Sequence, residues 1–308
     1  MSRRTWPGAV VLAVGVGLAL APAAFQMFTR APGGATMIEG FRPYMDAGTI
    51  EGFQRDLATI DAAHAEAHSL LATEPAGDHA SVRSFDAAWP AIEDDMGSML
   101  STMREDIEGF EGVAALPPFA LFPWFFVAPG GLLAVAGVVL LRRARAGRAP
   151  GRARVLAVAV GLGLVAAPFA FQMFSRAPGG ADMIADFRPF MTHDKVAEIQ
   201  GYFLTLGAAE GQARLELEPA ARRGAEVDAL ATWHREWPEI AATMAPMIGA
   251  MSDNVDNYLG VAALPPFGLF PWFFVVPGVL VVAVAAVRPG LAAPSPAPAP
   301  GAPERIPA

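Results

Sequence analysis

Methionine is the residue type in this chain that is best suited to bind a soft metal. The chain has 13 methionines, and all except Met1 fall into pairs at matching positions of its two halves. Two triplets share the spacing M-x2-M-x3-M: Met96, Met99 and Met103 in the first half, and Met244, Met247 and Met251 in the second. This spacing places three thioether sulfurs along one face of a helix, where they could bind Cu(I). The alternative is structural, because methionine also fills irregular helical cores.

A histidine pair is a second candidate for metal chemistry. His64 and His68, in the sequence HAEAH, are four residues apart and share one face of a helix. The matching positions of the second half hold Glu210 and Arg214, and the sequence offers no evident third ligand. We therefore predict no metal site and no cofactor. We expect instead that His64 and Glu210 meet between the two halves as a polar pair that fixes helix register.

Three further residue pairs are candidates for binding lipid or protein. They are Arg30 with Arg176, Arg42 with Arg188, and Trp89 with Trp237. Arginines just outside a membrane span can bind anionic headgroups or an acidic partner. Alternatively, the sequence RAPGG forms a turn at the membrane surface and its arginines are ordinary interface residues. Because GxSxG, HExxH and P-loop motifs are absent, we predict neither catalytic residues nor an enzyme.

The elements that position these residues are predicted to be helices, four of them in a membrane. The 308-residue chain is 54% hydrophobic and has no cysteine, which excludes disulfides and thiolate metal sites. Four stretches are uncharged and long enough to cross a bilayer, which takes about 20 residues. These stretches are residues 7–28, 117–141, 155–174 and 265–287. The sequence therefore predicts an all-α integral membrane protein with four transmembrane helices.

The distribution of charge predicts the orientation of these spans. Residues 142–154 contain six arginines and no acidic residue, which places this loop and both termini in the cytoplasm. The segments 29–112 and 175–260 then lie outside, with 5 basic against 16 acidic residues and 7 against 13, respectively. Abundant alanine, glycine, proline and arginine indicate a GC-rich bacterial gene. We expect a multi-pass protein of the bacterial cytoplasmic membrane, with lipids as partners and no nucleic acid.

The chain consists of two copies of one unit. Residues 15–34 and 161–180 are identical at fifteen of twenty positions, and the offset is 146 residues early in the unit and 148 later. Each unit runs span, outer segment, span, so both copies have the same orientation and a pseudo-two-fold axis along the membrane normal is expected. The predicted domains are repeat units 1–146 and 155–288, a basic cytoplasmic linker 147–154 and a disordered Pro/Ala-rich cytoplasmic tail 289–308.

The outer segments are predicted to be helical hairpins. Apolar residues at spacings of three and four begin at Ile50 and Phe85, and again at Val196 and Trp233. Two tandem extracytoplasmic hairpins would bury their apolar faces in a bundle of about four helices. Within the spans, small residues four apart predict close helix packing. They are Ala13, Gly17 and Ala21 in the first span, and Ala159, Gly163 and Ala167 in the third.

A proline-rich aromatic stretch occurs in both copies, as GVAALPPFALFPWFFVAPG and GVAALPPFGLFPWFFVVPG. Proline interrupts a helix because it lacks the donor N–H, and aromatic side chains favour the membrane interface. We interpret the stretch as a joint that redirects an outer helix into a span. Its key residues are Pro117, Pro118 and Trp124, with Pro265, Pro266 and Trp272.

Three classes of function remain open from the sequence. The first is a non-enzymatic membrane scaffold that binds lipid, an envelope protein or a second copy of itself through the acidic outer bundle. The second is a transporter, channel or lipid conduit between the two repeats. The third is extracytoplasmic copper binding or sensing by the methionines. Spans without ionisable residues disfavour ion or proton coupling.

Overall fold

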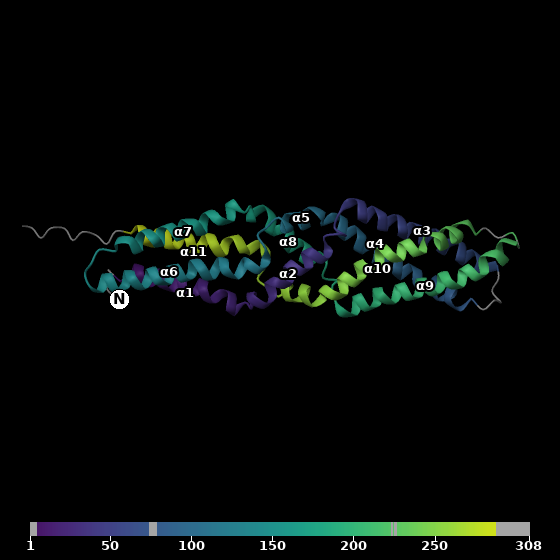
Figure 1. The fold of residues 1–308 in the computed structure, drawn as a ribbon, viewed down its shortest axis with the longest axis horizontal. Coiled ribbons are helices and arrows are strands. Elements are labelled where there is room, and N and C mark those ends of the chain that lie inside the picture. Colours follow the sequence, from purple (N-terminus) through teal and green to yellow (C-terminus); the bar gives the residue numbers. More distant parts are fainter. Residues whose placement is uncertain (1–4, 74–78, 223, 225–226, 288–308) are drawn as a thin grey trace, which may run out of the picture. The chain divides into compact units, whose positions relative to one another are not determined.

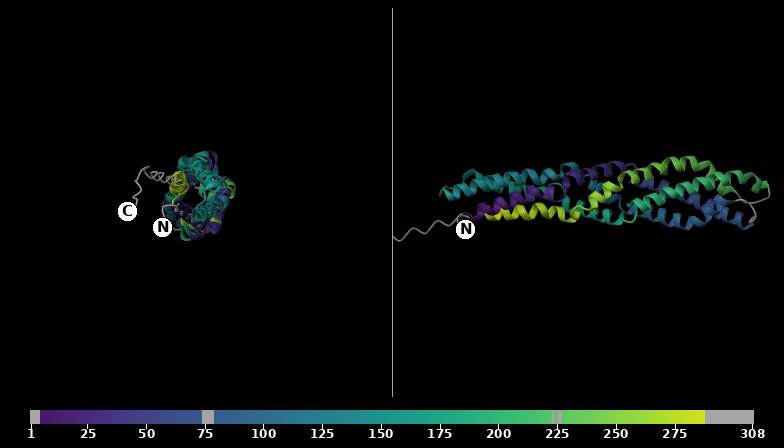
Figure 2. Two further views of the ribbon diagram at one scale, coloured as in Figure 1. Left: turned by 90° about the vertical axis from the view of Figure 1, so that its left-hand side faces the viewer. Right: turned by 90° about the horizontal axis from the view of Figure 1, so that it is seen from below.

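The protein is helical throughout the part of the chain that the structure describes. The structure is a computed structural model and describes residues 5–73, 79–222, 224 and 227–287 (Figures 1 and 2). The helices of the first half are α1 (Trp6–Ala24), α2 (Met27–Phe41), α3 (Ala47–Thr73), α4 (Ala80–Glu105), α5 (Ile107–Ala114), η1 (Phe119–Leu121) and α6 (Phe122–Arg145). Those of the second half are α7 (Gly151–Ala170), α8 (Met173–Asp186), α9 (His193–Arg222), α10 (Asp228–Ala262), η2 (Phe267–Leu269) and α11 (Phe270–Ala286).

The chain divides into two compact units, which we call the span unit and the core unit. The span unit comprises Met1–Pro22, Trp124–Ala170 and Trp272–Ala308, and the core unit comprises Ala23–Pro123 and Phe171–Pro271. The predicted disordered tail, 289–308, lies outside the described residues. Each unit is assembled from both halves of the sequence.

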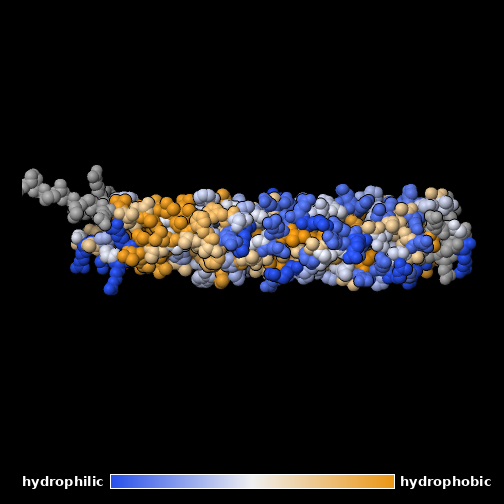
Figure 3. Space-filling view, turned by 90° about the horizontal axis from the view of Figure 1, so that it is seen from above, coloured by the Kyte–Doolittle hydropathy of each residue, from blue (hydrophilic) through white to orange (hydrophobic). Residues whose placement is uncertain are grey.

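The span unit holds the apolar helices predicted from the sequence. Among the described residues, four helical segments are long and apolar enough to cross a membrane: Trp6–Ala24, Phe119–Arg145, Gly151–Ala170 and Phe267–Ala286. The face of this unit drawn in Figure 3 is mostly hydrophobic, and Leu20, Val135 and Val155 are 60–69% exposed. Such a surface is suited to lipid rather than to water. The expectation of an all-helical chain with four apolar helices of spanning length is confirmed.

Glycines bring the apolar helices of the span unit together in pairs. A Cβ atom at Gly15 of α1 would lie 2.4 Å from the Ala134 nitrogen of α6, and one at Gly137 of α6 would lie 2.5 Å from the Leu12 nitrogen. Gly161 of α7 and Gly278 of α11 approach equally closely, because a Cβ at Gly278 would lie 2.7 Å from the Gly161 oxygen. These backbones can approach only where no side chain separates them.

The predicted small-residue face of these spans is wrong. A Cβ at Gly17 or Gly163 would meet nothing within 4 Å, and Ala13 and Ala159 are exposed. The contact face runs instead through Gly8, Val11, Gly15, Leu18 and Pro22 in α1. The physical reason is that every face of a span is apolar, so an Ala/Gly-rich helix offers several small-residue stripes of equal quality.

The first and third spans end sooner than predicted. α1 stops at Ala24 and α7 at Ala170, and the left-handed residues Gln26 (φ 55°) and Gln172 (φ 54°) follow. RAPGG is therefore not a turn, because it lies inside α2 and α8. The break lies four residues earlier, since a left-handed residue cannot continue a right-handed helix.

The core unit is built on the predicted apolar seams. Ile50 and Ile60 of the first half and Ile199 of the second are at most 1% exposed. The predicted seam of the second half extends to Leu217, whose side chain lies outside the described residues. α3 packs on α4 and α10, α4 packs on α9, and α10 packs on α9 and α2. α5 packs on α8. The short helices α2 and α8 begin inside the predicted spans, at Met27 and Met173, and continue through the predicted turns.

The proline-rich stretches interrupt the chain between helices. α5 ends at Ala114 and α10 at Ala262, and each is followed by a non-helical segment and then a short 3-10 helix. Pro118 and Pro266 have an extended backbone, with φ −51° and ψ of 130° and 131°. Trp124 and Trp272, at the start of α6 and α11, are 55% and 52% exposed. The linker is shorter than predicted, because α7 begins at Gly151.

Candidate functional site

The methionine triplets lie in the interior of the core unit. Met96, Met99 and Met103 are 1–3% exposed, and so are Met244, Met247 and Met251. Their sulfurs therefore do not form a surface patch.

Four of these six methionines, Met99, Met103, Met247 and Met251, line one small cavity whose volume is about 50 Å³. Eight methionines line it: Met37, Met45, Met99, Met103, Met183, Met191, Met247 and Met251. The other lining residues are isoleucine, phenylalanine and Tyr258, whose hydroxyl donates to the Ile184 carbonyl. With no charged side chain in its wall, the cavity offers thioether sulfur as its main donor. It could hold a soft cation or a very small apolar molecule.

The two tryptophans chosen from the sequence differ in their surroundings. Trp89 is 1% exposed, and its Nε1 donates to Asp61 Oδ1 at 3.0 Å. Trp237 is half-buried and packs its ring on Phe203 and Trp233. The position that matches Asp61 is Gly207, which explains why Trp237 makes ring contacts there rather than the same hydrogen bond.

The inner pair of arginines links the two halves of the chain. Arg30 Nη1 donates to the Ala263 carbonyl at 3.1 Å, and Arg176 Nη1 donates to the Ala115 carbonyl at 3.2 Å. Each arginine thus binds the carbonyl directly after α10 or α5 of the opposite half, where helix carbonyls lack intrahelical donors. Arg42 and Arg188 are exposed. Binding of lipid by these four residues stays a prediction.

The expected pairing of His64 with Glu210 is wrong. His64 Nε2 lies 3.0 Å from Asp86 Oδ1, and Glu210 pairs with His234 Nδ1. Asp86 and His234 occupy matching positions, at an offset of 148. These two acid–histidine pairs therefore occupy matching positions with the two partners exchanged. The cause of the error is that α3 contacts both α4 and α10, and periodicity cannot say which of them faces His64.

A groove between α3 and α10 is the largest concave feature we describe in the core unit. Its volume is about 1230 Å³, and its wall along α3 extends from residue 49 to residue 62. At 1.5 Å per helical residue this wall is about 20 Å long. Most of the lining is small or polar, including Thr49, Gly52, Thr59 and Ala62.

Four carboxylates give this groove its charge. Asp56 comes from α3, and Asp228, Glu236 and Glu239 come from α10, with Arg55 as the one basic residue of the described lining. Burial raises the pKa of Asp56; Arg55 opposes the rise, while Glu239 and Glu236 add to it. A positively charged group bound in this groove would therefore be stabilised.

The matching positions on α9 and α4 carry larger side chains that contact one another. Lys195, Tyr202 and Asp95 match Thr49, Asp56 and Thr243, respectively. Lys195 Nζ lies 2.8 Å from Asp95 Oδ2, and the Tyr202 hydroxyl donates to the same oxygen. Ala88 and Ala91 stand where the groove has Glu236 and Glu239.

Asp56, Glu236 and Glu239 were not selected from the sequence. The signal that could have found them is the difference between the two halves: Glu236 and Glu239 match alanines, and Asp56 matches a tyrosine. The candidate residues instead came from positions where the two halves agree.

Comparison with known proteins identifies no relative: no protein-family model, no curated protein and no solved structure matches this chain.

Proposed function

We propose that the chain is a non-enzymatic membrane scaffold whose acidic outer bundle binds a basic segment of a partner protein in the α3/α10 groove. In this proposal the core unit lies outside the bacterial cytoplasmic membrane, and the four apolar helices anchor it. The two tandem hairpins, α3–α4 and α9–α10, form a bundle related by a pseudo-two-fold axis.

Matching helix starts support the proposed duplication. α2 and α8 start 146 residues apart, as do α3 and α9, while α4 and α10 start 148 residues apart. These are the offsets of the sequence repeat. The positive-inside rule supports the orientation, because the last turn of α6 carries three arginines while acidic residues dominate the outer segments.

The groove is the observation that carries the proposed binding. It is open where Thr49, Asp56 and Thr243 replace the Lys195–Tyr202–Asp95 cluster of the other half. Compared with the opposite half, the groove thus has smaller side chains at these places and carries Glu236 and Glu239 in place of two alanines. Charge complementarity favours lysine or arginine side chains as the occupant. A wall about 20 Å long fits a helix of about 13 residues.

A peptide titration tests this proposal. The full-length protein in neutral-lipid nanodiscs is titrated with a fluorescein-labelled peptide of Lys-Ala-Ala repeats, and with a Glu-Ala-Ala control peptide. We expect anisotropy to rise with the basic peptide only, and Glu236→Gln with Glu239→Gln to weaken binding at least tenfold. The reason is that the two substitutions remove carboxylate charges and leave lysine charges of the bound peptide without partners, which is costly where water is excluded.

A triple variant supplies the matched control. Thr49→Lys, Asp56→Tyr and Thr243→Asp copy the residues of the opposite half into the groove. We expect this variant to melt like the wild type and to lose the basic peptide. Wild-type protein that does not bind the basic peptide, or a triple variant that binds it equally well, would overturn the proposal.

Copper binding in the methionine cavity is a second candidate, supported by its eight sulfur-bearing residues. A competition titration with Cu(I) and a chelator tests it on the purified full-length protein. Met99→Leu with Met247→Leu changes volume little and removes two donors. We expect this variant to lose Cu(I) without losing its fold; wild-type protein that leaves Cu(I) with the chelator rejects the candidate.

The conduit alternative has less support, because the methionine-lined cavity of the core unit has a volume of only about 50 Å³.

A further inference from the structure

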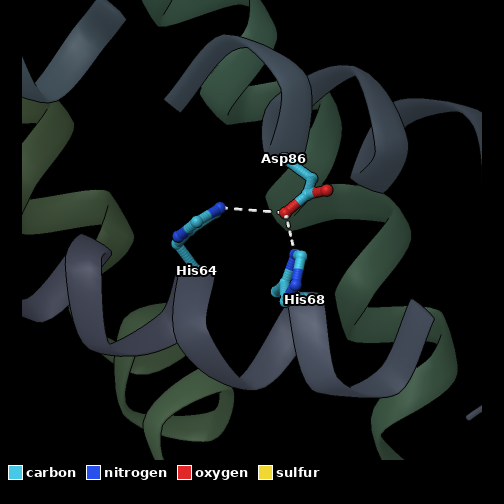
Figure 4. A group of neighbouring side chains, drawn as sticks. All are labelled: His64, His68 and Asp86. Carbon is cyan, nitrogen blue, oxygen red and sulfur yellow. Dashed lines mark hydrogen bonds and ion pairs between the residues drawn. The ribbon is translucent and has the colours of Figure 1, made fainter. Parts of the chain in front are cut away.

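A cluster of three potential metal ligands lies between α3 and α4, apart from the groove and the methionine cavity. His64 Nε2 and His68 Nδ1 lie 3.0 Å and 2.8 Å from the same atom, Asp86 Oδ1 (Figure 4). The ligand atoms of the three residues all lie within 4.8 Å of one another. Two histidines from one helix and a carboxylate from the next therefore converge on one point.

The comparison between the two halves separates a structural pair from an additional ligand. The His64–Asp86 pair has a counterpart in Glu210–His234, so an acid–histidine pair is part of both helix pairs. His68 has no such counterpart, because Arg214 occupies its matching position. Core packing does not account for His68 either, since its side chain is 68% exposed.

We propose that His64, His68 and Asp86 bind one Zn²⁺ ion, with water as the fourth ligand. Imidazole nitrogen and carboxylate oxygen are the ordinary zinc ligands, at about 2.0–2.2 Å from the metal. Tetrahedral ligands at these distances lie about 3.4 Å apart, so small side-chain shifts admit the ion between the present hydrogen-bonding partners. No change of backbone is required.

The surroundings of the cluster suit a preorganised site with access from solvent. The His64 ring stacks on Trp89, with centroids 5.8 Å apart, and meets the edge of Phe85 at 5.4 Å. These rings hold the His64 imidazole in place, and a ligand whose orientation is already fixed by packing favours metal binding. The exposed His68 leaves a path for the ion and a position for water. The bound ion would clamp α3 to α4.

Zinc stoichiometry tests the site directly. The full-length protein, carrying no histidine tag, is stripped with a chelator, dialysed against Zn²⁺ and analysed for metal. We expect one ion per chain in the wild type and at least tenfold weaker binding in His68→Arg. This substitution copies the second half at an exposed position, so the variant should melt at the wild-type temperature without zinc. Zinc should raise the melting temperature of the wild type but not that of His68→Arg.

Two further variants complete the design. His234→Gln removes a histidine from the opposite pair and should keep one zinc ion per chain. Arg214→His completes the same ligand set beside Glu210 and His234 and should add a second ion. Bound Co²⁺ should show tetrahedral d–d absorption in the wild type. Wild-type protein that takes up no zinc, His68→Arg that keeps it, or His234→Gln that loses it would each overturn the inference.

Discussion

At the scale of single residues, two acid–histidine pairs occupy matching positions in the two halves of the chain. His64–Asp86 and Glu210–His234 join the same two helix positions with acid and base exchanged. One partner cannot change alone, because a partly buried polar group without a partner is costly. We therefore expect that exchanging the acid and the histidine together preserves the interaction, whereas changing one of them alone removes it.

A pairwise exchange in the second half tests this coupling. Glu210→His alone places two imidazoles together, and we expect it to lower the free energy of unfolding by about 1–2 kcal/mol, a lost charge-assisted hydrogen bond. Adding His234→Asp rebuilds the pair of the first half and should recover most of that loss. Thermal unfolding followed by circular dichroism measures both variants. A double variant no more stable than the single one would show that positions 210 and 234 are not coupled.

Asp106 is the carboxylate whose environment disfavours its charge most clearly. It is 8% exposed, and its Oδ2 is buried without a hydrogen-bond partner. Burial raises its pKa to about 6, and the nearby Asp186, Asp182 and Glu105 contribute to the rise. The matching residue is Asn254, whose Nδ2 donates to the Ala250 carbonyl at 2.9 Å. The second half thus avoids the buried charge.

Asp106→Asn should therefore stabilise the protein in a pH-dependent way. The folded state holds a proton that the unfolded chain releases between about pH 4 and 6, so stability is lost as pH rises through this window. Asparagine removes that penalty. We expect a gain of about 1–3 kcal/mol at pH 7.5 that disappears near pH 4. Melting temperatures across this range measure it, and an equal gain at both ends would exclude the charge as its cause.

At the scale of helices, glycine position decides which faces of the spans pack. Gly15 and Gly17 belong to the same helix, but a Cβ at Gly15 would strike the backbone of α6 and one at Gly17 would meet open space. Gly15→Ala should cost about 1–3 kcal/mol through overpacking, whereas Gly17→Ala should be neutral or slightly stabilising. Unfolding in detergent compares the two variants. Equal melting temperatures would mean that α1 and α6 do not pack through Gly15.

The sequence could predict these helices but not their partners. Charge-free length identifies a span, and spacings of three and four identify the buried face of an amphipathic helix such as α3. Neither signal says what covers that face, which is why His64 was assigned to the wrong neighbour. Asp86 belongs to another helix, and its role as third ligand depends on packing. The left-handed Gln26 had no glycine or proline to mark it.

At the scale of the whole molecule, the two halves of the core unit depend on each other. α2 packs on α10 and α8 on α5, while Arg30 and Arg176 each donate to a carbonyl of the opposite half. We expect residues 1–149 and 150–308 to aggregate when either is produced alone, because each would expose the apolar surfaces that the other covers. Co-expressed halves should copurify through a tag on one of them. A half that remains monomeric and helical by itself would contradict this interdependence.

The proposed orientation, with the core unit outside the membrane, can be tested by cysteine labelling. Since the sequence has no cysteine, one introduced cysteine is a unique label site. Ser69→Cys lies on the exposed surface of α3, and Ala146→Cys lies just after α6, beside its final arginines. In intact bacterial cells, a membrane-impermeant maleimide should label the first variant and not the second, and it should label both after lysis. The parallel duplication requires the same outcome for an exposed position of α9, such as Leu204→Cys. Labelling of α3 or α9 only after lysis would contradict the proposed orientation of the core unit.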